Sequence, residues 1–272
     1  MDDRFRQLPR SLRERARTTT LAGVPALIAT PQTAAPAPVM VWMHGRTVDK
    51  ELDPGRYLRW LRAGIATIAL DLPGHGERPG PRLHDAEYTP RVLAQMLGEL
   101  DDAVAAARTI DEAPSIDFGR IGIGGMSAGG MVALRRLCDS HTFVCAAVES
   151  TTGWLAELYD PTLTETPPCR ADHDPAVIEP IDPMRHLNTW RPIPLLVLHS
   201  EADETVPFLG MRAFTDKLRG QYDHPAEIEL VTWPETGAPS EHAGFGRVAA
   251  EAKSIQTEFL VRHLKPLASA QG

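Results

Sequence analysis

The 272-residue sequence has few cysteines and no long hydrophobic run, and each absence excludes a class of protein. Its three cysteines are an odd number without CxxC spacing, which argues against a disulfide framework or a zinc knuckle and favours a reducing cytoplasm. No apolar stretch approaches the roughly 18 residues that would span a bilayer. The arginine-rich N-terminal segment is interleaved with acidic residues, unlike a targeting peptide. We therefore expect a soluble, cytoplasmic protein that does not engage a membrane.

Positive charge is also in short supply. The chain has 28 Lys and Arg against 36 Asp and Glu, a formal net charge of −8, so nucleic acid is not an expected partner. Hydrophobic residues at 43% and charged residues at 24% are typical of a folded globular chain. The length suits one sizeable domain, and a homodimer is one assembly that the sequence leaves open.

Short apolar segments alternate with longer segments of helical period almost throughout the chain. The expected strands are 39–43, 65–70, 120–123, 143–148, 195–199 and 228–233, and the expected helices are 56–63, 91–108, 129–138, 207–219 and 247–264. Near-continuous apolar strands joined through helices predict a mostly parallel central sheet with helices on both faces, a three-layer α/β architecture. The 18–30 segment, broken at Gly23 and Pro25, adds an antiparallel hairpin at the edge.

The helix over 91–108 has the clearest pattern. Thr89 is positioned to cap it and Pro90 suits its first turn. Its apolar residues form one stripe that would cover a sheet: Val92, Leu93, Met96, Leu97, Leu100, Val104 and Ala107.

Two connections are longer than such folds usually have, 72–85 and 151–191. The second is rich in proline, and we interpret it as a cap insertion after the sixth strand, counting the hairpin. Both follow the carboxyl end of a strand, where open α/β sheets bind their ligands. We expect one domain over 1–272 with an N-terminal extension at 1–17.

The strongest local motif is GGMSAGG at 124–130, a G-x-S-x-G pattern centred on Ser127. It lies between a strand and a helix, where a serine hydroxyl can be held on a sharp turn above the sheet edge. Gly125 and Gly129 leave room for the close backbone approach of that turn. A plain glycine-rich turn is the alternative, whereas a phosphate loop is disfavoured because no G-K-[ST] or G-x-G-x-x-G occurs here.

Asp203 and His242 follow the strands 195–199 and 228–233 in chain order. With Ser127 they give the order nucleophile, acid, histidine of one known type of catalytic triad, in which His242 would take the serine proton and Asp203 would orient the imidazole. Individually, Asp203 could simply cap a helix and His242 could be an ordinary loop histidine. Glu149 and Glu201 are competing acids, but the first requires an atypical site and the second comes too early.

An oxyanion hole needs two backbone donors near the serine. One is expected from the N–H of Ala128, directly after the nucleophile. The strand 39–43 leads into His44 and Gly45, and the freedom of Gly45 would let the N–H of Arg46 turn toward the site. A simple strand-ending turn at His44 and Gly45 is the alternative.

A short apolar cluster begins the cap insertion. Trp154, Leu155, Leu158 and Tyr159 have the spacing of one helix face, which fits either packing of the cap or the lining of an acyl pocket. We take Trp154, Leu158 and Tyr159 as candidate substrate-binding residues.

Together these motifs, over roughly residues 20–265, make the chain resemble the α/β-hydrolase superfamily. His44-Gly45, the DLPGHG segment at 71–76, the Ser127 turn, the DETVP segment at 203–207 and His242 stand in the order of that superfamily. The doubled glycines and Asp-x-x-Val-Pro are similar to its dienelactone hydrolase-like and prolyl oligopeptidase-like branch. Serine instead of cysteine at 127 departs from dienelactone hydrolases, and no His-Gly-Gly-Gly is present.

The sequence thus predicts a serine esterase that cleaves carboxylic esters of small to medium acyl groups through an acyl-enzyme. Its partner would be a small-molecule ester, and neither a cofactor nor a metal is implied. A peptidase or thioesterase on the same triad is the alternative within enzymes. A non-catalytic ligand-binding protein with the cap insertion as its lid is the alternative outside them.

Overall fold

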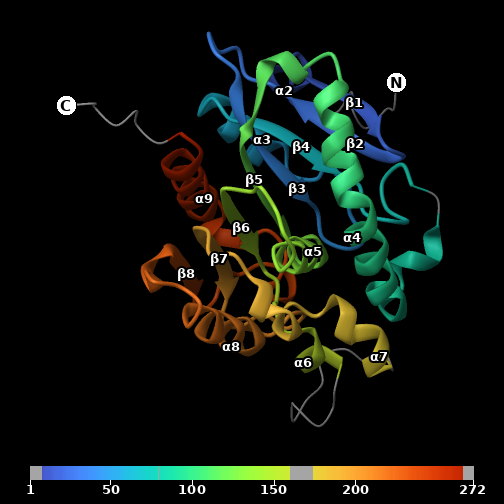
Figure 1. The fold of residues 1–272 in the computed structure, drawn as a ribbon, viewed down its shortest axis with the longest axis vertical. Coiled ribbons are helices and arrows are strands. Elements are labelled where there is room, and N and C mark those ends of the chain that lie inside the picture. Colours follow the sequence, from blue (N-terminus) through green and yellow to red (C-terminus); the bar gives the residue numbers. More distant parts are fainter. Residues whose placement is uncertain (1–7, 79, 160–173, 266–272) are drawn as a thin grey trace.

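A computed structural model describes residues 8–78, 80–159 and 174–265 of the chain, and a single eight-stranded sheet runs through it (Figure 1). The strand order is β1-β2-β4-β3-β5-β6-β7-β8. β2 is antiparallel to both of its neighbours, and every pair from β4 to β8 is parallel. The strands are β1 Ala16–Leu21, β2 Val24–Ala29, β3 Ala37–Met43, β4 Ala66–Leu70, β5 Ile116–Met126, β6 Cys145–Glu149, β7 Leu195–Ser200 and β8 Ile228–Trp233.

Helices occupy most of the connections between the strands. They are α2 Arg10–Arg13, α3 Pro54–Arg62, α4 Thr89–Ala106, α5 Ala128–Arg136, α6 Leu155–Tyr159, α7 Pro175–Ile178, α8 Phe208–Arg219 and α9 Ala249–Leu264. Short 3₁₀ helices lie at Pro81–His84, Ala86–Tyr88, Ala107–Thr109, Ala113–Ser115, Glu179–Ile181, Pro183–Arg185, Leu187–Thr189, Pro225–Glu227, Pro239–Glu241 and Gly246–Val248.

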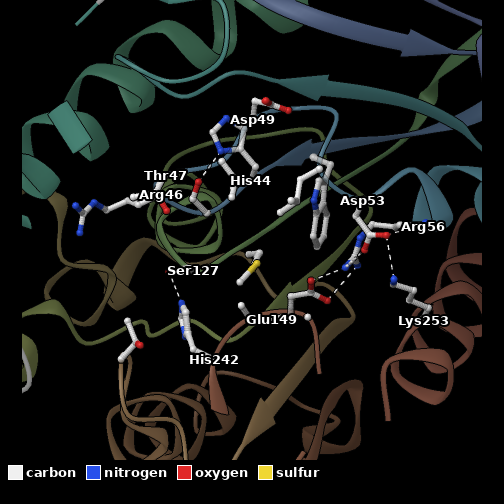
Figure 2. Close-up of a pocket in the computed structure, with 18 of the residues that line it drawn as sticks. His44, Arg46, Thr47, Asp49, Asp53, Arg56, Ser127, Glu149, His242 and Lys253 are labelled. Carbon is white, nitrogen blue, oxygen red and sulfur yellow. Dashed lines mark hydrogen bonds and ion pairs between the residues drawn. The ribbon is translucent and has the colours of Figure 1, made fainter. Parts of the chain in front are cut away.

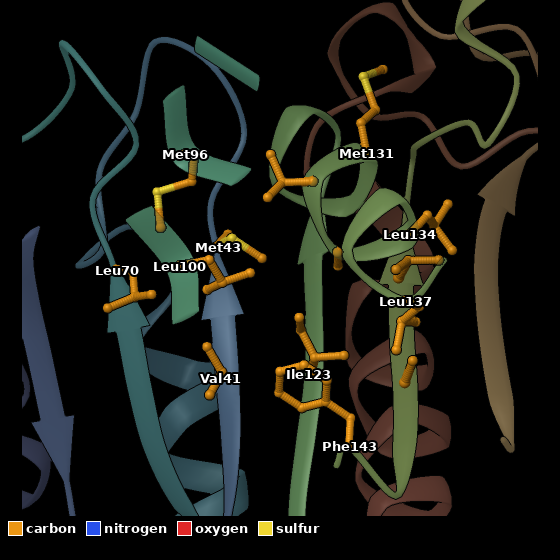
Figure 3. Packing of buried hydrophobic residues seen from close by; sticks show 14 of the residues in the cluster. Val41, Met43, Leu70, Met96, Leu100, Ile123, Met131, Leu134, Leu137 and Phe143 are labelled. Carbon is orange, nitrogen blue, oxygen red and sulfur yellow. The ribbon is translucent and has the colours of Figure 1, made fainter. Parts of the chain in front are cut away.

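The sheet is buried on both faces, because alternate side chains of its strands enter two different hydrophobic clusters. In β3, Val41 and Met43 pack with α4, α5 and α8, whereas Met40 and Trp42 pack with α3 and α9. Figure 3 shows part of the first cluster, where Leu100 of α4 lies beside Val41 and Met43. The structure therefore confirms the predicted three-layer fold.

The predicted edge hairpin is present as β1 and β2, which pair from Ala16↔Ala29 to Leu21↔Val24. Ala22 and Gly23 join them with φ values of 47° and 89°. Positive φ at both positions of a two-residue turn matches the right-handed twist of the flanking strands.

Helix α4 has the predicted apolar stripe but begins differently from the prediction. Val92, Met96 and Leu100 are fully buried. Thr89 is the first helical residue rather than the cap, and its hydroxyl donates to the carbonyl of Ala86 in the preceding turn. The prediction of Thr89 as cap was wrong because a short 3₁₀ helix precedes α4 and takes the chain directly into it.

β5 is longer than predicted and reaches from Ile116 to Met126. Asp117 and Phe118 at its start are partly exposed and Gly119 is exposed, so an apolar pattern could not reveal them. The extra length matters for the site, because β5 carries the chain out to Ser127 at the carboxyl edge of the sheet.

The N-terminal helix α2 packs against the layers around the sheet, and the two ends of the cap insertion are bonded to each other. The predicted boundary of the N-terminal extension falls inside β1, and Leu12 of α2 is completely buried against the α3 and α9 layer. In the cap insertion, the Asp182 carboxylate accepts hydrogen bonds from the backbone N–H groups of Leu155 and Ala156 at the start of α6. Residues 160–173 of this insertion lie outside the described residues. Among the helices that the structure describes, none is long and apolar enough to cross a bilayer.

Candidate active site

Ser127 lies on a strained turn between β5 and α5. Its φ and ψ are 51° and −120°, a conformation that side-chain-bearing residues rarely adopt. Its backbone N–H donates to the Glu149 carbonyl at 2.9 Å, and its own carbonyl accepts from the Thr151 hydroxyl at 2.7 Å. These bonds to the end of β6 and the following loop fix the turn and hold the Ser127 side chain above the sheet edge.

The glycines on either side of Ser127 are required by space. A Cβ atom at Gly125 would lie 2.4 Å from the Gly129 carbonyl carbon, and one at Gly129 would lie 2.3 Å from the Met43 carbonyl oxygen. Both contacts are with backbone, which cannot move aside. The G-x-S-x-G pattern thus lets α5 start directly against β3 and β5.

The structure brings Ser127, His242 and Asp203 into one line of hydrogen bonds. The Nε2 atom of His242 lies 3.0 Å from the Ser127 Oγ, and its Nδ1 lies 2.8 Å from the Asp203 Oδ2 and 3.1 Å from the Oδ1. Because an ionised carboxylate only accepts, Nδ1 carries the proton and Nε2 accepts from the serine hydroxyl. This is the arrangement in which a histidine can act as a base toward a serine.

Asp203 is held ionised at the start of the loop after β7. Its carboxylate accepts from the backbone N–H groups of Thr205 and Val206 at 2.9 and 2.8 Å. Burial opposes ionisation of this group, but hydrogen bonds from His199 and His242 outweigh burial and lower its pKa to about 2. His199, at 3.5 Å from the Oδ2 atom, was not identified from the sequence, because it reads there as one residue of a buried strand.

His242 is carried by a loop whose backbone is fixed by its neighbour, Glu241. The Glu241 carboxylate accepts from the Thr236 and Gly237 N–H groups and from the hydroxyls of Thr236 and Ser200. The Thr236 bonds, more than the others, lower the pKa of Glu241 to about 2. Glu241 itself has a φ of 52°. Sequence reasoning missed Glu241, because a glutamate next to a loop histidine carries no recognisable pattern.

The two competing acids have other partners. Glu149 forms a buried ion pair with Arg56, and the Glu201 carboxylate accepts from the Thr232 hydroxyl at 2.7 Å. Asp203 is the acid that contacts His242.

The predicted oxyanion donors both border the serine. Ala128 is the first residue of α5, and Gly45 is so close to the turn that a Cβ on it would lie 3.4 Å from that of Ser127. The His44 Nδ1 donates to the Gly45 carbonyl at 2.6 Å while its Nε2 accepts from the Leu72 N–H. Among the described residues, no acceptor contacts the N–H of Ala128 or Arg46. Both N–H groups are available as donors.

A buried cluster around Asp71, which the sequence did not reveal, fixes the loop that contains Arg46. Asp71 accepts from the Lys50 backbone N–H at 2.9 Å and from its ammonium at 2.8 Å. Burial opposes ionisation of Asp71, but the nearby His44 ring and the hydrogen bonds from Lys50 outweigh burial and hold its pKa well below the usual range. A Cβ at Gly76 would meet the Asp71 carboxylate at 2.2 Å, which accounts for the glycine in the 71–76 motif.

A cavity of about 540 Å³ opens beside Ser127 and His242 (Figure 2). It extends between the loop after β3, helix α3 and the end of β6. Its lining residues are Trp42, His44, Gly45, Arg46, Thr47, Val48, Asp49, Leu52, Asp53, Arg56, Tyr57, Met126, Ser127, Glu149, Thr205, His242, Ala243, Gly244 and Lys253.

Two of the predicted substrate-binding residues, Trp154 and Leu158, lie elsewhere. Leu158 is 4% exposed within the hydrophobic core, and neither it nor Trp154 lines the cavity among the residues that the structure describes. The side chain of Tyr159 lies outside the described part. For Leu158 the structure favours the alternative of cap packing, because the helix α6 turns this face toward the core.

This fold and this site define a serine hydrolase of the α/β-hydrolase class. Within that class, the chain belongs to the prolyl oligopeptidase family, whose profile matches residues 56–266. This finding confirms the prolyl oligopeptidase side of the predicted resemblance.

Individual relatives carry both esterase and peptidase names. Esterase YjfP of Escherichia coli is 27% identical over 197 residues, which cover 69% of this chain and 78% of that protein. Putative esterase YitV of Bacillus subtilis is 24% identical and is matched over 78% of this chain and 88% of its own length. Among solved structures, TT1662 from Thermus thermophilus has a TM-score of 0.72 at 23% identity over 92% of this chain and 99% of that one. The acylaminoacyl peptidase of Pyrococcus horikoshii has the same score at 17% identity over 92% of this chain, but only 42% of that one is matched.

Proposed function

We propose that this protein hydrolyses carboxylic esters through an acyl intermediate on Ser127. The observation that carries the proposal is the unbroken hydrogen-bond line from Ser127 through His242 to Asp203. Two esterase-named relatives that match over most of their own length support ester rather than amide chemistry.

In the proposed first half-reaction, the Ser127 Oγ attacks the ester carbonyl carbon while His242 Nε2 takes its proton. The negative charge that develops on the carbonyl oxygen is stabilised by the N–H groups of Ala128 and Arg46. Asp203, ionised and bonded to Nδ1, stabilises the imidazolium. The alcohol then leaves with the proton from His242, and the acyl group stays on Ser127.

The second half-reaction repeats these roles with water. His242 removes a proton from a water molecule, and the resulting nucleophile attacks the acyl carbon. Collapse of the second tetrahedral intermediate breaks the bond to Ser127 Oγ, which regains its proton from His242 as the carboxylic acid departs.

Hydrolysis of p-nitrophenyl acetate, butyrate, octanoate and palmitate tests the proposal, with Ser127→Ala and His242→Ala alongside. Both variants should lose at least about 10⁴-fold in kcat/KM, because the two residues act as a unit. Ser254→Ala on α9 and His224→Ala before β8 are the matched controls and should keep wild-type activity. Activity that survives Ser127→Ala would reject the mechanism.

A peptidase is the second candidate, because the family and the Pyrococcus horikoshii relative carry that name. An alanine p-nitroanilide and a short acyl thioester, assayed with the same variants, separate the three chemistries. A fluorophosphonate probe separates all of them from a ligand-binding protein, since labelling of Ser127 requires an activated hydroxyl.

A further inference from the structure

The far wall of the cavity beside Ser127 is built of charged side chains rather than of apolar ones. In Figure 2, Asp53, Arg56, Glu149 and Lys253 gather at the end away from His242. Arg56 and Glu149 are only 4% and 3% exposed. An ordinary pocket for an alkyl chain would end in leucine or phenylalanine at this depth.

These charges neutralise one another through direct contacts. Arg56 bonds both oxygens of Glu149, with Nη1 at 3.0 Å from Oε2, and its Nη2 lies 3.1 Å from the Asp53 Oδ2. The Lys253 ammonium lies 2.9 Å from the Asp53 Oδ1. The cavity as a whole is lined by three acidic side chains and three basic ones. Because the charges balance, the wall favours neither an anion nor a cation.

The wall still offers hydrogen bonds to a neutral group. The Lys253 ammonium, on a side chain that is 23% exposed, bonds Asp53 and has two further N–H donors from which a ligand can accept. The Trp42 ring packs against the Arg56 guanidinium with its centroid 4.4 Å from Cζ, which leaves an apolar flank beside a polar end. A group with a carbon chain and an oxygen atom matches both surfaces.

An alkyl group at this wall is at a disadvantage. It would displace water from ionised side chains and return no hydrogen bond. An ether, hydroxyl or carbonyl oxygen can accept from the wall and lose less on desolvation. We propose that this cavity selects esters with a neutral, oxygen-bearing substituent, with the charged wall of Asp53, Arg56, Glu149 and Lys253 as the specificity determinant. The inference rests on the proposed function, since it names the substrate class of that same site.

Pairs of isosteric esters test this selection. The acyl pair is p-nitrophenyl 3-methoxypropionate and p-nitrophenyl pentanoate, and the alcohol pair is 2-methoxyethyl butyrate and butyl butyrate. Within each pair, only an ether oxygen replaces a methylene. The readout is the ratio of kcat/KM for the ether ester to that for the alkyl ester, compared between wild type and variants, so that the intrinsic reactivity of each ester cancels.

The main variant is Arg56→Met/Glu149→Leu, which removes the charged pair together and leaves no unpaired buried ion from it. Its ether-to-alkyl ratio should fall by about threefold to tenfold in one of the two pairs, the effect of one hydrogen bond. The pair that responds shows which half of the ester enters the cavity. Arg262→Met/Glu229→Leu, which removes an exposed ion pair between α9 and β8, is the matched control and should keep the wild-type ratio.

Lys253→Met is a second variant for the same wall, on a partly exposed side chain of α9 whose loss leaves the core intact. It should shift the same ratio in the same direction by a similar factor, because it removes the accessible donor itself. Ser127-dependent hydrolysis with an unchanged ratio in Lys253→Met and in a folded double variant would overturn the inference. If the double variant does not fold, the ether-to-alkyl ratio of Lys253→Met alone decides whether the inference stands. Absence of Ser127-dependent ester hydrolysis would instead overturn the proposed function and the inference with it.

Discussion

Ser127 and His242 meet across a hydrogen bond of 3.0 Å, yet the two regions that carry them are built from different interactions. The Ser127 turn is enclosed by backbone and core: Gly125 and Gly129 touch main-chain atoms, and α5 behind them is almost entirely buried. The His242 loop is half-exposed and is tied by polar bonds through Glu241 to Ser200, Thr236 and Gly237.

Substitutions in the two regions should therefore have different effects on stability and on activity. Packing around the turn is shared with the folding core, so damage there should reduce the stability of the whole domain. The polar ties of the His242 loop lie outside the two hydrophobic clusters of the core, so damage there should misplace the imidazole and leave the core folded. Activity and stability measured together on each side test this difference.

The largest effect is expected from Gly129→Ala. The added Cβ would lie 2.3 Å from the Met43 carbonyl oxygen, so β3 and α5 must separate, at a cost of about 3 kcal/mol or more in unfolding free energy. Urea denaturation followed by circular dichroism measures it. Gly98→Ala, in the exposed middle of α4 where the methyl group meets nothing, is the control and should gain up to about 1 kcal/mol. Equal stability of the two variants would contradict the packing argument.

Next is Glu241→Gln, which should lower kcat by about tenfold to a hundredfold with little loss of stability. The amide keeps the size of the carboxylate but can no longer accept from all four donors. A displaced His242 is no longer aligned with both Asp203 and the Ser127 Oγ, so it takes the serine proton less well.

Glu201→Gln is the control for this change, because Glu201 also follows β7 but accepts from Thr232, away from His242. A loss of kcat that only matches the loss of folded protein would mean that Glu241 has only a structural role.

The same contrast explains what could be predicted from the sequence. The Ser127 turn was predictable because its geometry is local: a strand, a glycine on each side of the serine and a helix. Asp203 and His242 were found from their order after apolar strands. Glu241 was not, because its role depends on four donors that only the folded loop brings together.

The cavity shows the same limit. Trp154 and Leu158 have a spacing that fits packing and pocket lining equally well, and the sequence cannot tell which way α6 turns. The actual cavity combines Trp42, Arg56 and Glu149 from three separate elements, and their proximity follows from the order of the strands in the sheet rather than from any spacing along the chain.

Low pH should lower the unfolding free energy of the protein by protonating Asp203. Its folded pKa of about 2 lies below its usual value, so its stabilising effect is complete above about pH 4 and is lost as the pH falls toward 2. Between pH 6 and pH 3, wild type should therefore lose about 1 kcal/mol more unfolding free energy than Asp203→Asn. Urea titrations at each pH measure the difference, with Asp216→Asn on α8 as control. Parallel stability curves for wild type and Asp203→Asn would exclude this role.

The smallest effect is expected from Thr151→Val, which removes a hydrogen bond from the densely packed Ser127 turn. This variant tests most directly whether the two regions differ. The Thr151 hydroxyl donates to the Ser127 carbonyl at 2.7 Å and is completely buried, while the Met131 N–H donates to the same carbonyl at 3.0 Å. Thr151→Val keeps the shape of the side chain and leaves the Ser127 carbonyl with one donor, the Met131 N–H. It should therefore cost about 1 kcal/mol of unfolding free energy. If packing holds the turn, kcat should stay within about threefold of wild type. Thr215→Val on α8, another buried hydroxyl bonded to a backbone carbonyl, is the matched control. A loss of kcat as large as that of Glu241→Gln would show that the serine side also depends on its polar ties.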